Sequence, residues 1–134
     1  MHTTNYANTF IEVAEDCKVQ AGTVPPEKTE RTVAQIQYDL ISQHPYKFTS
    51  DDVIFMAHAE KKQIEPEDLE DARAAFFSKG QACLRASPLG KTYGWGVHAN
   101  AESKVAIFAQ GSEEYQVFAR DASVKHLKAM RSSR

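Results

Sequence analysis

The sequence lacks any apolar run long enough to cross a membrane, because no stretch approaches the roughly 18 residues that such a helix needs. Its first ten residues, MHTTNYANTF, contain neither the positively charged nor the apolar region of a secretory signal. Cysteine is also scarce: Cys17 and Cys83 form no CxxC pair, so no disulfide framework is expected. We therefore predict a cytoplasmic protein without a membrane partner.

Glycine, proline and net charge are low as well. Six glycines and five prolines in 134 residues exclude a collagen-like chain and are too few for a disordered one. Sixteen basic and eighteen acidic side chains give a formal charge of -2. This balance argues against a protein that coats a polyanion with its whole surface, although it allows a local basic face. No repeat or linker divides the chain, so we predict a single domain over residues 1–134.

The first half of the chain predicts one strand followed by three helices. Residues 8–15 have the side-chain alternation of a β-strand. Apolar periodicity and capping residues predict helices from about residue 29–32 to 43, from Ser50 onward, and from Pro66 to residue 79. Residues 53–57 are apolar on all sides of the second helix, so we expect this helix to be the most buried.

The second half predicts a β-hairpin at about 93–110. In its first strand Tyr93 and Trp95 share one face, whereas Gly96 and His98 share the other. A turn and the return strand follow, and Ser112 is placed to cap a short helix. Residues 124–131 fit either a strand or a basic helix. Together these elements predict an α+β fold in which about three helices pack on one face of a small antiparallel sheet.

Several segments resemble a known protein family: HTTNYANTFIEVAEDC, HPYKFTSDDVIF, FFSKGQACLRASPLGKTYGWGVH, SEEY and the terminal KAMRSSR. They are similar to a family of short, uncharacterised bacterial and fungal proteins that is described as a domain of unknown function. The resemblance covers nearly the whole chain, and residues 76–98 are its most specific part. It implies one full-length domain and brings no activity, substrate or catalytic residue with it.

Residues 73–101 contain no carboxylate and combine cations with aromatic side chains. Such a set suits a phosphate or carboxylate that bears a planar group. Glycines on one face of the strand leave room for a ligand; the competing interpretation is that they admit a packing helix, with Trp95 in the core and the cations solvated. Arg85 and Lys91 would hold the anion, and an aromatic ring would stack on the planar group. We predict a binding site for a small anionic or planar ligand, formed by Arg85, Ser87, Lys91, Tyr93, Trp95 and His98.

A thiol enzyme is one of two alternatives. Cys83 would be the nucleophile and His98 the base if the loop at 81–92 folded back over the hairpin. The competing interpretation is that Cys83 is a buried structural residue, which is the commoner environment of a free cysteine.

A nucleic-acid-binding protein is the other alternative. The C-terminal tail from Val124 has no acidic side chain, and beside a hairpin it would suit a phosphate backbone. A solvated chain end explains the same charges. The cations of this tail are Lys125, Lys128, Arg131 and Arg134.

No cofactor or metal site is predicted. Residues 90–92 (GKT) resemble the end of a phosphate-binding loop, but Arg85 occupies the position of its first glycine and Pro88 removes a backbone donor. The five histidines show no HxxxH or HExxH spacing. None of these patterns decides whether the protein is an enzyme.

Overall fold

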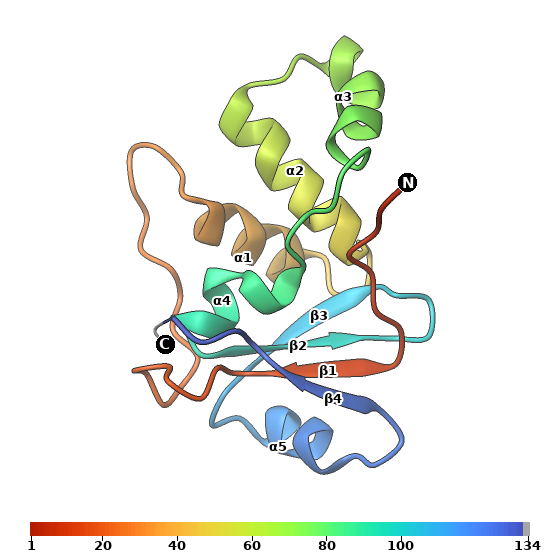
Figure 1. Ribbon diagram of the computed structural model, residues 1–134. Coiled ribbons are helices and arrows are strands. Elements are labelled where there is room, and N and C mark those ends of the chain that lie inside the picture. The colour runs from red at the N-terminus through yellow and green to blue at the C-terminus, as the bar shows by residue number, and fades with distance from the viewer. Residues whose placement is uncertain (133–134) are drawn as a thin grey trace.

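Four strands form one sheet in the computed structural model, which describes residues 1–132 (Figure 1). From edge to edge they are β3 (Val105–Ala109), β2 (Trp95–Ala99), β1 (Thr9–Glu12) and β4 (Lys125–Lys128). The predicted first strand and the predicted hairpin are confirmed as β1 and as the β2–β3 pair. The C-terminal segment, for which the sequence left two alternatives, forms a strand.

The sheet is mixed, so the prediction of an antiparallel sheet is wrong for one pair of strands. β1 pairs with β2 and β2 with β3 in antiparallel fashion, whereas β1 and β4 are parallel, with Phe10 opposite His126. The connection explains the difference. After β3 the chain passes through α5 (Glu113–Arg120), so that β4 runs in the same direction as β3 and β1 (Figure 1).

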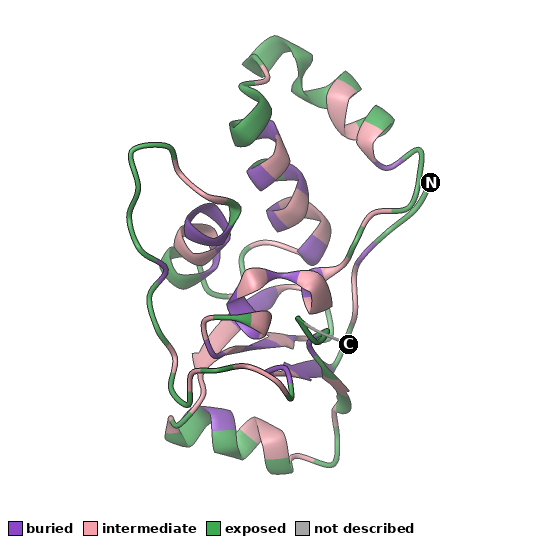
Figure 2. Ribbon diagram, turned by 60° about the vertical axis from the view of Figure 1, so that its left-hand side comes forward, coloured by how far each residue is buried: buried purple, intermediate pink, exposed green. Residues whose placement is uncertain are grey.

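Helices cover both faces of the sheet, so the prediction that they pack on one face is also wrong. Of the five α-helices within residues 1–132, α1 (Val33–Gln43), α2 (Ser50–Lys62) and α4 (Pro88–Lys91, after the turn η2, Leu84–Ala86) lie on one side, and α5 lies on the other (Figure 1). Phe10 and Ile11 are adjacent in β1, point to opposite faces and are both buried. Each face therefore needs its own apolar cover. Figure 2 shows buried residues in the strands and on α1, α2 and α5.

The helices of the first half start close to where the sequence predicts. Thr32 caps α1 and Thr49 caps α2, each in a capping box, and Ser50 is the first residue of α2 rather than its cap. Pro66 opens a 3₁₀ turn, η1 (Pro66–Asp68), which leads into α3 (Leu69–Phe76). No helix within residues 1–132 is both long enough and apolar enough to cross a membrane.

Helices α2 and α3 extend away from the sheet and enclose a small apolar cluster of their own (Figure 1). Its buried members are Phe55, Ala59 and Phe77. The N-terminal segment holds both ends of this pair. The Thr4 N–H and hydroxyl donate to Asp51 Oδ1 at 2.6 and 2.7 Å, at the start of α2. The His2 N–H donates to the Phe77 carbonyl at 3.0 Å, just after α3.

Gly96 provides a test of the packing between β2 and α5. A Cβ at this position would lie 2.7 Å from Phe10 Cζ and from Tyr115 Cε2, two rings that already pack edge to face. We expect Gly96→Ala to lower the free energy of unfolding by about 1–3 kcal/mol, as overpacking of a core does. Urea unfolding measures this change. Gly80→Ala is the control, because the nearest atom to its added Cβ is His2 Nδ1 at 3.9 Å. Equal stability of the two variants would contradict the packing described here.

Candidate functional site

An open apolar groove of about 610 Å³ lies between α2 and α3. Apolar side chains form most of its lining, with polar groups along its borders: Phe55, Met56, Ala59, Glu60, Gln63, Ile64, Leu69, Glu70 and Arg73. Met56 and Leu69 are 37% and 36% exposed, although both are large apolar residues. Its volume is within the range of ligand-binding clefts, roughly 300–1,000 Å³. This groove is therefore the candidate site.

The groove exists because α2 has apolar residues on more of its sides than the neighbouring elements cover. Val53 and Ala57 are buried on one side of the helix, and Phe55 and Ala59 pack toward α3 on another. Helix α3 has only eight residues, so it leaves Met56 uncovered. The expectation that α2 would be the most buried helix is therefore wrong: Met56 is exposed, Ile54 is only partly buried, and the shorter α1 has as many buried residues as α2.

Arg73 forms the charged end of the groove, and its charge is already compensated. Its guanidinium lies 2.8 Å from Asp52 Oδ1 and over the rings of Phe55 and Phe77, at 5.8 and 5.6 Å from their centroids. Partial burial acts to raise the pKa of Asp52, but hydrogen bonds from Thr49 and Arg73 outweigh it and lower that pKa. The pair is therefore ionised at neutral pH and leaves no free cation in the groove.

Acidic side chains occur on both helices that line the groove and in the residues just before α3. Five carboxylates of residues 65–71 make no hydrogen bond or ion pair within the described part of the chain: Glu65, Glu67, Asp68, Glu70 and Asp71. On the other border, Glu60 Oε1 accepts from Arg31 at 3.0 Å. The α3 side of the groove thus carries negative charge that the described part of the chain does not neutralise.

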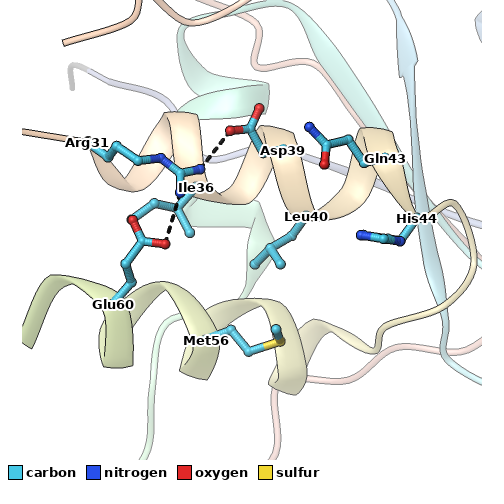
Figure 3. A pocket seen from close by; sticks show the side chains of 8 residues that line it. All are labelled: Arg31, Ile36, Asp39, Leu40, Gln43, His44, Met56 and Glu60. Atoms are coloured by element: carbon cyan, nitrogen blue, oxygen red, sulfur yellow. Dashed lines mark hydrogen bonds and ion pairs between the residues drawn. The ribbon is translucent and has the colours of Figure 1, made fainter. Parts of the chain in front are cut away.

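A smaller hollow of about 260 Å³ lies between α1 and α2 and shares Met56 and Glu60 with the groove (Figure 3). Arg31 spans its far end, at 2.6 Å from Asp39 and 3.0 Å from Glu60. Figure 3 shows the side chains of Met56 and Leu40 directed into the space between the two helices. Met56 therefore lies on a ridge between two adjoining hollows.

The structure does not bring the six residues predicted to bind a ligand into one arrangement. The Arg85 Nε donates to the Lys128 carbonyl at 2.8 Å, and the Ser87 hydroxyl is buried and donates to Gln37. These two side chains hold η2 against β4 and α4 against α1.

The aromatic members of the predicted set are divided between the two faces of the sheet. Trp95 packs against Tyr38 of α1 and donates its indole N–H to the Thr23 carbonyl at 2.8 Å. The carbonyl of Tyr93 accepts from the Thr23 N–H. His98 lies on the opposite face, beside α5. The ligand-binding prediction thus rests on residues with separate packing roles, apart from Lys91, which lines a different hollow.

The two residues of the predicted thiol enzyme have different partners. Cys83 Sγ lies 3.5 Å from Tyr6 Oη, on the face that carries α4, whereas His98 pairs with Tyr46 on the α5 face. The hydrogen bond with Cys83 is the main reason that the pKa of Tyr6 is raised. Within residues 1–132 no group of three histidine, cysteine or acidic side chains is placed to hold a metal ion.

The basic tail predicted to bind nucleic acid is part of the sheet. Lys128 Nζ lies 3.1 Å from Glu15 Oε1, so one of its cations is paired with an acid. The hairpin that was expected beside it is integral to the sheet, since β2 lies between β3 and β1. Arg134 of this tail lies outside the described residues.

A model of the family of unknown function DUF6157 matches residues 1–134. The chain belongs to the DUF6157 family. The predicted membership of a domain of unknown function is thereby confirmed, and its occurrence in bacteria and fungi stays a prediction. No curated protein and no solved structure matches the chain. We therefore infer the function from the surface of the DUF6157 chain itself.

Sequence reasoning missed the groove of this DUF6157 protein, but two signals pointed toward it. One is the helix segment 53–57, which is apolar on all sides. The other is the acidic run at 65–71, which the helix dipole alone explains in sequence terms. These two signals indicate a groove with an acidic side only once α2 and α3 are known to lie side by side.

His98 and Tyr46 form a neutral polar pair under α5. Tyr46 Oη lies 2.8 Å from His98 Nδ1, and the imidazole stacks on Phe118 with centroids 4.2 Å apart. Tyr46 has a left-handed backbone (φ 59°), which its N–H bond to the Val105 carbonyl holds in place. Burial lowers the pKa of His98, against a smaller opposing effect of Asp121, and burial raises the pKa of Tyr46.

This pair predicts a pH dependence of stability. Because the pKa of His98 is lower in the folded than in the unfolded chain, the unfolded chain binds more protons as the pH falls through about 6.5. The contribution of His98 to the free energy of unfolding is therefore greatest above that pH and decreases below it. We expect His98→Gln to flatten this decrease between about pH 7 and pH 5 in urea unfolding. His58, whose pKa burial also lowers, contributes to the slope that remains. An unchanged profile would contradict the assignment.

Proposed function

We propose that this DUF6157 protein is a protein-interaction domain that binds an amphipathic helical segment of a partner in the α2–α3 groove. The observation that carries the proposal is the open apolar floor between two helices, with Met56 and Leu69 uncovered. A concave and mainly apolar cleft with a few polar groups on its lining is typical of a binding site.

The shape of the groove favours a helix over a small molecule. Its lining follows α2 from Phe55 to Gln63, about 12 Å along the helix axis, or more than two turns. This length matches apolar anchors spaced four and seven or eight residues apart in a bound helix. Met56, on the border that the groove shares with the neighbouring hollow, is an unbranched side chain that adapts to differently shaped partners.

A second candidate keeps part of the predicted ligand-binding function. Lys91 and Thr92 line a hollow of about 450 Å³ together with Lys18, Asp16 and Ser132. Neither lysine side chain has a hydrogen-bond or ion-pair partner within residues 1–132. Two ammonium groups beside a hydroxyl suit a small anion such as phosphate.

Calorimetric titration with inorganic phosphate tests this second candidate. We expect Lys91→Gln to weaken phosphate binding severalfold, because the neutral amide removes one of two charges. Lys125→Gln, on the edge strand β4, is the matched control and should leave the affinity unchanged. No measurable heat with the unmodified protein, or equal affinity of both variants, would exclude an anion site at this hollow.

The groove is tested by selecting peptides from a displayed random library against the purified protein. We expect enriched peptides to bind Met56→Glu and Leu69→Glu at least about tenfold more weakly, because each charge removes an apolar anchor worth about 1.5–3 kcal/mol. Val117→Glu is the matched control: Val117 is 61% exposed and lies on α5, across the sheet. Circular dichroism verifies that the variants are folded. Peptides that lose affinity only with Val117→Glu would place the interaction elsewhere.

A further inference from the structure

We propose that the occupant of the groove is a basic amphipathic helix, with lysine or arginine on both flanks of its apolar stripe. This inference rests on the proposed function of the α2–α3 groove and adds the charge of the partner. Apolar contact with the groove floor supplies affinity for any amphipathic helix, whereas the charges around the floor decide which helix is preferred.

The charge of the α2–α3 region is strongly one-sided. Residues 50–80 carry eight carboxylates but only four lysines and arginines, although the whole chain has a net charge of only -2. Among these cations Arg73 is paired with Asp52, and Lys61 lies 3.2 Å from Glu30 of the preceding loop. Two of these four cations are thus engaged by acids, and no lysine or arginine within residues 1–132 pairs with the carboxylates of residues 65–71.

Two of the carboxylates flank the apolar floor directly. Glu60 of α2 and Glu70 of α3 both line the groove, from opposite sides. Glu67 and Asp71 are one turn or less from Glu70 along the chain. A helix lying in the groove would place the residues on either side of its apolar stripe beside these two acidic borders.

On the α2 border, the partner's cations would meet a carboxylate, that of Glu60, which already pairs with Arg31. Glu60 accepts from Arg31, whose other guanidinium nitrogen binds Asp39. On the α3 border, in contrast, Glu67, Glu70 and Asp71 have no partner within residues 1–132. We therefore expect the α3 border to contribute most to the preference for a basic helix. An acidic helix or an anionic lipid surface would be repelled by the same carboxylates.

Two synthetic peptides of about 14 residues test the charge of the partner, a length that is near the minimum for a helix in water. Both carry leucine on one helical face, and the remaining positions are lysine in one peptide and glutamate in the other. Fluorescence anisotropy measures their affinities for the full-length protein. We expect the lysine peptide to bind at least about tenfold more tightly, with the ratio falling as salt rises from low to high concentration.

Charge-neutral variants locate the effect. Glu67→Gln combined with Glu70→Gln should reduce the preference for the lysine peptide severalfold. Glu113→Gln combined with Glu114→Gln is the matched control, because these acidic residues occupy the first turn of α5 on the other side of the sheet. Both pairs are at exposed positions, and circular dichroism verifies that each variant retains its helices.

The outcomes separate this inference from the proposed function. If the glutamate peptide binds as tightly as the lysine peptide, and Met56→Glu weakens both, the groove binds helices but the inferred charge of the partner is wrong. If the lysine peptide binds and Met56→Glu has no effect on it, the peptide is held by charge alone and both proposals fail. Absence of binding by either peptide also overturns the inference.

Discussion

The anchoring of α2 in two separate apolar clusters is the constraint on which the rest of the molecule depends. Val53, near the start of α2, is buried in the main core, on the face of the sheet that α1 and α4 also cover. Phe55 and Ala59 are buried against α3. The second cluster is too small to hold a helix pair by itself. The Thr49 cap and the bonds from the N-terminal segment to Asp51 therefore fix the direction in which α2 leaves the sheet. With α3 only eight residues long, this geometry necessarily leaves an uncovered apolar strip.

Local signals in the sequence predicted much of the fold. Capping residues at the start of the first two helices, proline at the start of the third and alternation in the hairpin each act over a few residues. Each element formed near its expected position, although Thr49 rather than the expected Ser50 caps α2. The predictions that were wrong concern contacts between residues far apart in the sequence. Nothing within KHLK indicates that β4 pairs parallel with β1, since pairing depends on the route of the chain through α5. The adjacent apolar residues Phe10 and Ile11 are consistent with a sheet that is buried on both faces. Which helices cover each face, however, depends on the path of the whole chain.

The candidate site was less predictable, for a related physical reason. The predicted ligand residues were grouped because they are close along the chain. However, their side chains were taken up by distant partners: Ser87 bonds Gln37, and Trp95 packs on Tyr38. The alternation of β2 by itself separates Trp95 from His98. The groove, in contrast, joins two helices that look ordinary when each is taken alone. An all-round apolar segment predicts deep burial unless the covering helix is known to be short.

Amide NMR of the isotopically labelled protein, titrated with the lysine-flanked amphipathic peptide, tests the central claim most directly. The account predicts that the signals that shift belong to residues 55–73, with the largest changes near Met56, Leu69 and Glu70, while those of α5 and β4 stay in place. Shifts centred on α5, on the β2–β3 hairpin or on the hollow around Lys91 would contradict it, because binding would then use a surface other than the groove.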